Sequence, residues 1–452
     1  MGLEERVFIA LGSNLGDKSA CLFGALQKLR EIAKVIATSF LYKTSPMYVE
    51  NQPSFYNAVC EIRTEREPLD LLHQLQDIES SFGRVRRGER YGPRSLDLDV
   101  LIFGNRIINT EELIVPHPRL AERDFVLFPL RDIDRNLPLA TGETVEQACE
   151  RVSAVAKDMK RLCPRRVVSC GNKEFLWGEK TYTMGILNVT PDSFSDGGKY
   201  QSVENALQRA MEMIDVDIVD IGGQSTRPGI EYISVEEEKS RVIPVIKAIR
   251  ENLPNVIISI DTFRHEVAQA AVENGAHIVN DVSCGLLDEK MFDTVHSLGV
   301  PYMAMHMRGT SKTMMQFTEY SSYPSVVLGV ATELERRIDV LLKQGFPRWL
   351  LIVDPGIGFA KSFGQNVELI RNLGEFKSRL SDMPVLVGVS RKGFIAKIAD
   401  CASTEDGSDW ATAGAVTAAI AFGADIVRFH RPELIHTVKV ADELFRKVQR
   451  LS

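Results

Sequence analysis

Short apolar runs alternate with stretches long enough for a helix throughout the second half of the chain, and this rhythm constrains the fold more than any other feature. Strands that alternate with helices pair in parallel. Because the runs are continuously apolar, we expect both faces of each strand to be covered. Eight such units favour a (β/α)8 barrel over an open doubly wound sheet, which usually has fewer strands. The runs lie at 183–190, 217–223, 256–262, 277–283, 301–307, 350–356, 384–390 and 424–430.

Polar or glycine residues stand at the end of every one of these runs. Barrel enzymes carry their chemistry at the carboxyl ends of the strands, so the pattern predicts a site at that face. The alternative is helix capping, since Asp, Asn and Ser are preferred N-cap residues. Capping explains any one of them, but eight consecutive strand ends favour a site. The residues are Asn188, Gly222, Gly223, Asp261, Asn280, Asp281, His306, Asp354, Ser390, Arg428 and His430.

The first 160 residues have a different rhythm. Four apolar runs are typical of strands, and two longer segments carry apolar residues at helical spacing. Their order, β-α-β-β-α-β, predicts a ferredoxin-like α+β domain. The expected strands are at 7–13, 35–44, 55–63 and 95–103, and the expected helices at 17–35 and 68–83.

An amphipathic segment at 145–162 and a small predicted hairpin separate the two halves, which places the join near Cys163 and Pro164. The expected fold class is therefore α/β. Residues 1–163 form a ferredoxin-like α+β domain, and residues 164–452 form a TIM barrel.

The composition is that of a globular protein, with 44% hydrophobic and 25% charged residues among 452. No apolar stretch approaches the roughly 20 residues that span a bilayer, and the sequence opens with neither a basic nor an amphipathic leader. The net charge of −7 does not favour nucleic acid or anionic membranes as partners. The seven cysteines lack metal-binding spacing, so we expect reduced thiols and a cytoplasmic location.

The segment GSNLGDKS, from Gly12 to Ser19, looks like a phosphate-binding P-loop but has the wrong spacing. That motif needs four residues between its glycines and a lysine directly after the second. Here three residues separate the glycines, and Asp17 precedes the lysine. We therefore expect a strand-to-helix turn that uses glycine for its tight geometry.

Asp97 and Asp99 stand in the strand-like run 95–103. Strand side chains alternate, so both carboxylates lie on one face. Such a pair suits Mg²⁺, which completes its coordination shell with substrate phosphates. The alternative is that the two aspartates simply face solvent on an edge strand. Arginine binds phosphate oxygens in pairs, and five arginines lie just upstream: Arg84, Arg86, Arg87, Arg90 and Arg94.

Four segments follow one another in the first half: GSNLG, NQPSFYNAV, RYGPRSLDLDVLIFG and VPHPRLAERDFVLFPL. In their order and spacing they resemble the 6-hydroxymethyl-7,8-dihydropterin pyrophosphokinase family. The resemblance covers about residues 5–160 and implies transfer of pyrophosphate from ATP to a pterin hydroxymethyl group. Asp97 and Asp99 would hold two Mg²⁺ on the triphosphate. The catalytic Arg84 and Arg94, with Arg86, His117 and Arg123, match positions near the nucleotide. Thr44, Phe55, Asn57 and Phe125 match the pterin pocket.

A second set of segments occurs in order along the second half: MGILNVTPDSFSDGGKY, DIGGQSTRPG, IDTFRHEVA, NDVS, MHMRGTSKTMMQ, DPGIGFAKS, GVSRKGF and IVRFH. With these segments the second half resembles dihydropteroate synthase across about residues 165–450. The implied reaction joins the pterin pyrophosphate to p-aminobenzoate and releases pyrophosphate.

The resemblance also implies roles for residues of this half. Asp261, Asn280, Asp354 and Lys392 would hydrogen-bond the pterin, with Asp261 stabilising the cation left by C–O cleavage. Asn188, Arg428 and His430 would take the leaving pyrophosphate with one Mg²⁺. Lys392, Asp261 and Arg428 would be the catalytic members. The other substrate-binding positions are Phe194, Ser225, Thr226, Arg227, Phe359, Gly388 and Ser390.

Three rival readings remain. One half could be a degenerate regulatory module, although no key residue is missing. The first half could bind RNA through its arginines, but RNA-binding sheets of that fold present paired aromatics, and the aspartate pair would repel phosphate without metal. The barrel could catalyse a pterin-dependent methyl transfer. Two segments favour the synthase instead: SRK, which begins at Ser390, and STRPG, which begins at Ser225. We expect small-molecule substrates and a homodimer through the barrel.

Overall fold

The structure of the chain is a computed structural model that describes residues 4–47, 51–84, 92–158, 164–189, 199–225, 229–400 and 405–446. It divides into two compact units, Met1–Ser169 with Leu342–Trp349, and Cys170–Leu341 with Leu350–Ser452. Each unit is described by itself. The expected join at 163/164 borders residues outside the described ranges and stays a prediction.

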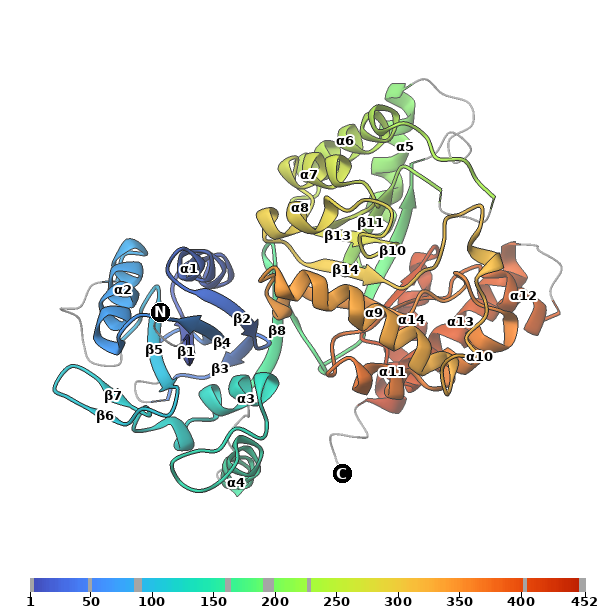
Figure 1. Ribbon diagram of the computed structural model, residues 1–452. Helices are drawn as coiled ribbons and strands as arrows, with labels where there is room; N and C mark the ends of the chain where they lie inside the picture. Colours follow the sequence, from blue (N-terminus) through green and yellow to red (C-terminus); the bar gives the residue numbers. More distant parts are fainter. Residues whose placement is uncertain are drawn as a thin grey trace. The chain divides into compact units, whose positions relative to one another are not determined.

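The first unit is an antiparallel sheet covered by helices on both faces (Figure 1). Within this unit the strand order is β5-β1-β4-β3-β8, with β2 also paired to β4. This arrangement confirms the ferredoxin-like expectation. The strands are β1 (Glu5–Ser13), β2 (Lys34–Thr38), β3 (Tyr42–Thr44), β4 (Phe55–Thr64), β5 (Asp97–Phe103) and β8 (Arg165–Cys170), and the short β6 (Ile108–Asn109) and β7 (Ile114–Val115) form a separate hairpin. The short β9 (Lys173–Leu176) belongs to the second unit.

One expected strand, 35–44, is divided into β2 and β3. The break falls at Ser39, whose backbone N–H donates to the carbonyl of Val59 and whose Oγ accepts the Val59 N–H at 2.9 Å. The side chain therefore takes up one of the ladder positions on β4, and the chain resumes pairing only at Tyr42.

The two faces of this sheet carry different helices. α1 (Lys18–Ile32) and α2 (Pro68–Ser81) lie together on one face, and α3 (Asp124–Ile133) packs on β4 from the other, with α4 (Val145–Asp158) against it. Alternation along β5 sends Leu98 and Val100 toward the α1 and α2 side. Leu101 packs in the α3 core, and Asp97 and Asp99 share the face opposite to Leu98.

The second unit is a parallel barrel, as the eight apolar runs predicted. Strand order is β15-β14-β13-β12-β11-β10-β17-β16. A parallel bridge between Val353 and Val385 brings the two end strands together. The strands are β10 (Tyr182–Asn188), β11 (Ile218–Gly222), β12 (Ile257–Asp261), β13 (Ile278–Asp281), β14 (Tyr302–Met305), β15 (Leu351–Asp354), β16 (Leu386–Gly388) and β17 (Ile426–Phe429).

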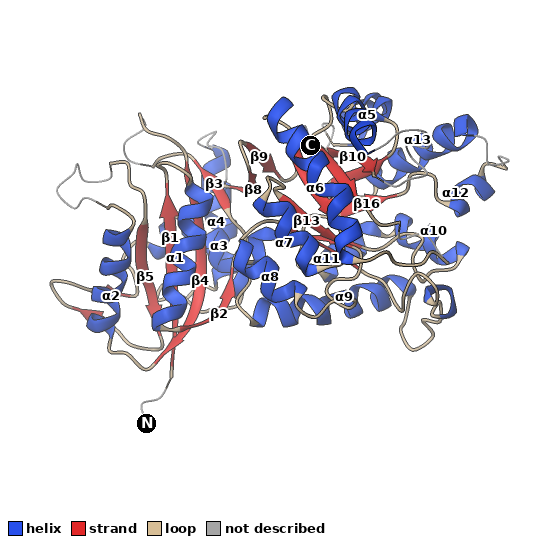
Figure 2. Cartoon of the chain, turned by 90° about the horizontal axis from the view of Figure 1, so that it is seen from above, coloured by secondary structure: helices blue, strands red, loops and turns tan. Residues whose placement is uncertain are grey.

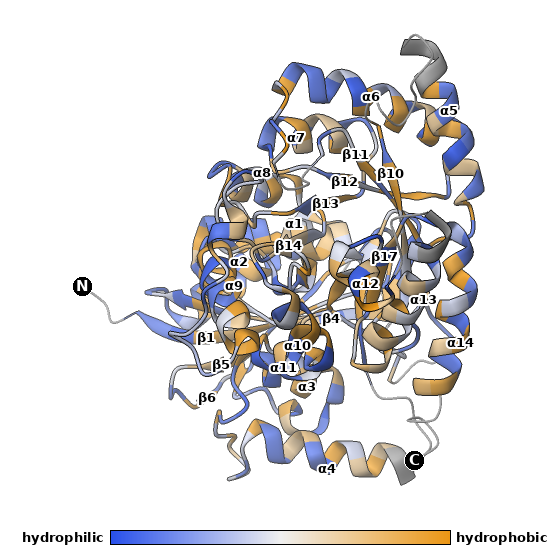
Figure 3. Cartoon of the chain, turned by 90° about the vertical axis from the view of Figure 1, so that its right-hand side faces the viewer, coloured by the Kyte–Doolittle hydropathy of each residue, from blue (hydrophilic) through white to orange (hydrophobic). Residues whose placement is uncertain are grey.

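Helices surround these strands (Figure 2). The strands carry hydrophobic residues such as those of β10, whereas surrounding helices such as α6 show hydrophilic residues as well (Figure 3). None of the helices in the described ranges has the length and apolarity needed to cross a membrane. The helices are α5 (Lys199–Glu212), α6 (Val235–Asn252), α7 (His265–Glu273), α8 (Met291–Leu298), α9 (Val326–Lys343), α10 (Phe363–Arg371), α11 (Leu373–Arg379), α12 (Gly393–Ile398), α13 (Glu405–Ala421) and α14 (Ile435–Phe445).

Candidate active sites

The aspartate pair of the first unit lies on β5 opposite the glycine-containing end of β1. Asp97 is opposite Gly12 and Asp99 opposite Ala10, so small residues leave room above the carboxylates. Arg84 and Arg94 each reach Asp97, with nitrogen–oxygen distances of 2.8 Å. The structure thus brings together four residues that the sequence placed at one site.

Asp99 is the less compensated carboxylate of the pair. Burial raises its pKa to about 6, the neighbouring Asp97 adds to the rise, and Arg123, Arg84 and Arg94 oppose it. Two carboxylates held this close in a partly buried place suit a divalent cation, which would favour their charged forms together.

Glu79 belongs to this site, and the sequence reading did not identify it. Its buried carboxylate forms an ion pair with Arg84 and accepts the backbone N–H of Leu98 at 2.8 Å. α2 thus fixes an arginine beside Asp97. The signal available in the sequence was a glutamate that continues the apolar spacing of Leu71 and Leu75 in the expected helix 68–83.

The expected pterin residues gather on the neighbouring strands. Asn57 Nδ2 donates to Thr44 Oγ1 at 2.7 Å, and both side chains are buried. A Cβ on Gly12 would lie 3.0 Å from Asn57 Oδ1. Phe55 and Phe125 are partly exposed, and the Arg123 guanidinium lies 5.5 Å from the centre of the Phe125 ring.

His117 follows β7, and its backbone N–H donates to the carbonyl of Leu101 on β5. Burial lowers the pKa of its imidazole to about 4, and Arg123 lowers it further. The ring is therefore neutral near pH 7, with Nδ1 accepting the Arg119 N–H at 3.2 Å.

The GSNLGDKS segment is a turn and not a P-loop. Gly16 has φ +62°, and the Asp17 side chain caps α1 by accepting the Ala20 N–H at 3.0 Å. The buried Asn14 accepts the Arg94 N–H at 2.7 Å and donates to Gln52 at 3.1 Å. The segment therefore ties together the loops that precede β5 and β4.

Arg428 is at the centre of the barrel site. From β17 it reaches Asp220 on β11 with Nε at 2.7 Å and Asp261 on β12 with Nη2 at 2.6 Å. Asn280 on β13 donates to Asp220 at 3.1 Å. Burial raises the pKa of Asp261 to about 7, which Arg428 opposes and Asp220 reinforces.

Asp220 is a second residue that the sequence reading missed. It is fully buried and joins Arg428 to Asn280, both of which were expected at the site. The signal was a carboxylate in the middle of the apolar run 217–223, flanked by Val219 and Ile221, where an unpaired charge would cost several kcal/mol.

Asp354, Phe359 and Lys392 form another side of this site. Asp354 Oδ1 accepts the Gly356 N–H at 2.7 Å. Burial raises the pKa of Asp354 to about 6, and Lys392, Arg428 and Lys361 oppose the rise. The Lys392 ammonium lies 4.4 Å from the centre of the Phe359 ring.

Ser390 and His430 are also brought together, with Ser390 Oγ 2.9 Å from His430 Nδ1. Gly388 ends β16 opposite Arg428. The Asn188 side chain lies near Asp261, since a Cβ on Gly222 would be 3.8 Å from Asn188 Oδ1 and 3.5 Å from Asp261 Cβ.

Not every polar strand end belongs to the site. Asp281 accepts hydrogen bonds from Ser283, from the Gly285 N–H and from the Tyr302 hydroxyl, all at 2.7–2.8 Å. Its carboxylate stabilises the turn after β13, so Asp281 has a local structural role and not a role in the site.

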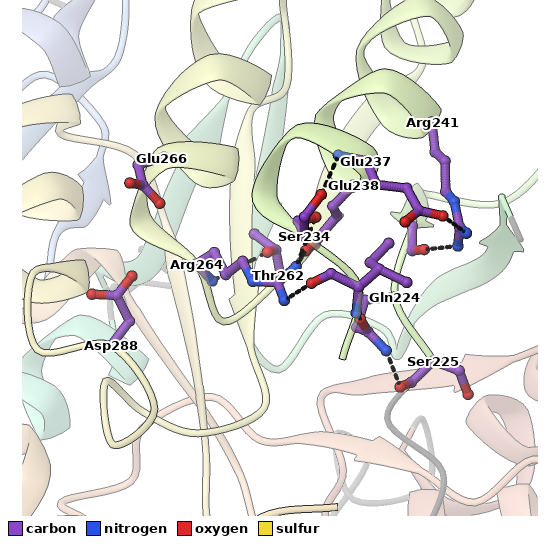
Figure 4. A network of polar contacts seen from close by, with 12 residues as sticks. Gln224, Ser225, Ser234, Glu237, Glu238, Arg241, Thr262, Arg264, Glu266 and Asp288 are labelled. Carbon is purple, nitrogen blue, oxygen red and sulfur yellow. Dashed lines mark hydrogen bonds and ion pairs between the residues drawn. The ribbon is translucent and has the colours of Figure 1, made fainter. Parts of the chain in front are cut away.

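The segment after β11 is held by a polar network (Figure 4). Gln224 accepts the Ile233 N–H at 2.8 Å and donates to the Ser225 carbonyl at 2.7 Å. The Arg264 guanidinium pairs with the buried Glu238 and donates to the Ile233 carbonyl. Ser225 is thereby fixed at the barrel rim. Four expected site residues lie outside the described ranges: Arg86, Phe194, Thr226 and Arg227.

Comparison with known proteins gives the family. The family described as 7,8-dihydro-6-hydroxymethylpterin-pyrophosphokinase matches residues 8–135, and the family described as Pterin binding enzyme matches residues 184–430. The chain is 42% identical to the "Folate synthesis bifunctional protein" of Arabidopsis thaliana, across 98% of this chain and 96% of that one. The chain belongs to the bifunctional folate synthesis family. It is a transferase with a pterin pyrophosphokinase part and a dihydropteroate synthase part.

Other members of the folate synthesis family differ in extent. The chain is 43% identical to "Folic acid synthesis protein fol1" of Pneumocystis carinii over 98% of its own length, but spans 60% of that relative. "Dihydropteroate synthase" of a Synechocystis strain is 44% identical and matches 61% of the chain. The Plasmodium falciparum HPPK-DHPS structure with pteroate has a TM-score of 0.79 at 21% identity and covers 98% of both chains, which confirms the fold.

Proposed function

We propose that Asp97 and Asp99 hold two Mg²⁺ with ATP and that the first unit transfers the β,γ-pyrophosphoryl group to the hydroxymethyl oxygen of 6-hydroxymethyl-7,8-dihydropterin. The new bond joins that oxygen to the β-phosphorus, and the hydroxyl loses its proton. The bond between the β-phosphorus and the oxygen that bridges to the α-phosphate breaks, and AMP leaves with that oxygen. Mg²⁺ bound there would neutralise charge that develops along the triphosphate. The same-face carboxylate pair on β5, with Arg84 and Arg94 beside it, carries this proposal.

The remaining residues of the first unit would divide between the two substrates. Arg84 and Arg94 would stabilise the transferred group, and His117, Arg123 and Arg86 would bind the nucleotide. Phe55 and Phe125 would stack on the pterin ring while Asn57, fixed by Thr44, hydrogen-bonds its edge. The neutral state of His117 fits a hydrogen-bonding role better than an ionic one.

In the second unit we propose that Asp261, Asn280, Asp354 and Lys392 bind the pterin. Arg428 and His430, with Asn188 and one Mg²⁺, would take the pyrophosphate. The C–O bond breaks with its electrons going to pyrophosphate, and the p-aminobenzoate nitrogen then bonds to the methylene carbon and loses a proton. The pairing of Arg428 with Asp261 and Asp220 supports this, since it fixes the guanidinium where negative charge accumulates.

For the second substrate we propose contacts from residues around the barrel mouth. Ser390 would bind the carboxylate of p-aminobenzoate, and Phe359 and Gly388 would border the pterin. Ser225, Thr226, Arg227 and Phe194 would close over p-aminobenzoate. Ser225 has the best-defined support, because Gln224 and the adjoining network fix its backbone.

A coupled assay tests the whole scheme. The intact chain would receive hydroxymethyldihydropterin, ATP, Mg²⁺ and p-aminobenzoate, with AMP and dihydropteroate measured together. We expect one AMP for each dihydropteroate, AMP alone when p-aminobenzoate is omitted, and neither product without ATP. AMP formation that never leads to dihydropteroate, even with ready-made pterin pyrophosphate, would contradict the synthase assignment.

We propose a homodimer formed through the barrel. Apolar side chains are exposed on adjacent helices near the end of the chain: Trp410 on α13 is 80% exposed, and Val440 and Leu444 on α14 are 60% and 59% exposed. A group of this kind is typical of a surface that is covered by a partner.

We also propose a cytoplasmic location. All five cysteines of the described ranges are free thiols, which suits a reducing compartment. One relative from Arabidopsis thaliana is named mitochondrial. Microscopy of a tagged full-length protein in its own cell decides between the two.

A further inference from the structure

A fully buried lysine lies under the loop that follows β15. Lys361 is 2% exposed, and its Nζ lies 3.0 Å from His306 Nδ1 and 2.9 Å from the Phe359 carbonyl oxygen. Lys361 is not among the residues proposed to act in either reaction. A buried ammonium group costs several kcal/mol of solvation unless other groups compensate it, so its presence calls for a reason.

The loop that Lys361 closes carries two of the proposed pterin contacts. It runs from Asp354 to Lys361 and contains Gly356 and Gly358 with φ +69° and +84°, and Ala360 with φ +49°. A Cβ on Gly356 would lie 2.0 Å from the His306 carbonyl oxygen and 3.4 Å from Lys361 Nζ. The backbone therefore folds tightly around the ammonium group, which bonds back to Phe359 within the same loop.

A chain of polar contacts through His306 and Glu333 fixes the ammonium group. His306 Nε2 lies 3.0 Å from Glu333 Oε2, and Arg308 Nε donates to the same oxygen at 2.8 Å. Burial lowers the pKa of His306 to about 4, so the ring is neutral. With Nε2–H donating to Glu333, its Nδ1 is free to accept from Lys361, and the tautomer is set by both neighbours.

We propose that Lys361 is a positioning residue of the synthase site, whose buried ammonium group holds the loop carrying Asp354 and Phe359 in the shape that binds the pterin. The contact chain through His306 and Glu333 to Arg308 keeps that group in place. This inference rests on the proposed pterin contacts of Asp354 and Phe359. It predicts that loss of Lys361 weakens binding of the pterin substrate and leaves binding of p-aminobenzoate unchanged.

The charge of Lys361 has a second consequence at Asp354. Asp354 must be ionised to accept hydrogen bonds from the donor edge of the pterin. The charged groups that face it are Lys361 of its own loop, Lys392 after β16 and Arg428 of β17, and all three lower its pKa, which burial raises to about 6. Lys361 itself faces Asp354, Glu333, Arg308 and Lys392, and burial lowers its pKa to about 7. Removing this cation raises the pKa of Asp354, so the acid limb of the rate profile moves to higher pH.

The test uses the full chain with ready-made pterin pyrophosphate and p-aminobenzoate between pH 6 and 9. For Lys361→Met we expect kcat/KM for the pterin substrate to fall about tenfold at pH 6.5 and about threefold at pH 8.5, with KM for p-aminobenzoate within about twofold. Lys247→Met removes an equivalent charge from an exposed position on α6 and should leave the profile unchanged.

A loss that is equal at all pH values and equal for both substrates would overturn the inference, because general damage to the barrel acts in that way. If Lys361→Met lacks a cooperative unfolding transition, Glu333→Gln takes its place. Glu333 is partly exposed, and this change weakens its interaction with His306. The acid limb of the rate profile should then move to higher pH by a smaller amount. An unchanged profile for Glu333→Gln would then refute the inference. Failure of the wild-type chain to make dihydropteroate would instead refute the proposed function.

Discussion

Single carboxylates and their cations determine most of what the two sites can do. Asp97 is paired with two arginines, and Arg428 is shared by Asp220 and Asp261. In both places the burial of charge is compensated by a fixed partner, which keeps the charged atoms at defined positions before a substrate arrives. Sequence alone gives the charges but not the partners.

Asp97→Ala should abolish AMP formation, because the remaining Asp99 cannot by itself supply the paired carboxylates that the metal site requires. Dihydropteroate synthesis from ready-made pterin pyrophosphate should stay within about twofold of wild type, since Asp97 belongs to the other unit. Separate assays of the two half-reactions measure this.

Lys392→Ala is the reciprocal control. It should lower dihydropteroate formation at least about a hundredfold while AMP formation is retained. Loss of both activities in either variant would mean that the two halves do not act independently.

At the level of elements, the loop after β15 depends on backbone conformations that only glycine adopts readily. Gly356→Ala would place a Cβ 2.0 Å from the His306 carbonyl oxygen at φ +69°. Since backbone atoms must move, we expect a loss of about 2–4 kcal/mol in the free energy of barrel unfolding, and loss of synthase activity. Denaturant unfolding and a synthase assay check both.

Gly364→Ala provides the matched control for that change. This glycine lies in the first turn of α10, and its added Cβ would meet no atom within 4 Å. Its stability should be equal to or slightly above wild type. A similar loss in both variants would show that space around Gly356 is not the cause.

The edge between β12 and β13 should make the barrel sensitive to acid. His277 Nδ1 accepts the Ile258 N–H at 3.1 Å, and burial lowers the pKa of His277 to about 4, with Arg250 lowering it further. The unfolded chain takes up this proton near pH 6.5. The contribution to stability is therefore complete above pH 6.5 and is lost as pH falls toward 4.

His277→Gln should consequently reduce the fall in barrel stability between pH 7 and pH 5 by about 1–2 kcal/mol, after allowance for partial exposure of the ring. Calorimetric Tm values at the two pH values measure the difference. His436→Gln, at an exposed position on α14, should change nothing. Parallel pH curves for wild type and His277→Gln would contradict the assignment.

For the whole molecule, the proposed homodimer predicts a mass of twice 50.5 kDa in solution. The double substitution Val440→Asp and Leu444→Asp should yield a monomer, because two desolvated carboxylates would oppose burial of α14. Light scattering after gel filtration gives the mass. Val340→Asp, an exposed apolar position on α9, is the control that should stay dimeric. A wild-type mass equal to that of a monomer would contradict the proposed homodimer.

The sequence alone determined the larger features of this protein. Eight apolar runs predicted eight parallel strands, and all eight are present with their order preserved. Alternation in SLDLDVLIF predicted that Asp97 and Asp99 share a face, and pairing with β1 agrees. Such features are local: periodicity and spacing act between residues that are close along the chain, so they can be read from it.

Only the tertiary structure decided which charged groups meet. Asp220 and Arg428 are 208 residues apart in sequence, and Lys361 and His306 are 55 apart. No local pattern distinguishes Asp281, which shapes a turn, from Asp261, which faces Arg428. A buried charge is stable only beside its partner, and barrel closure selects that partner from distant strands. For this reason the partners of Glu79, Asp220 and Lys361 became known only when the strands were in place.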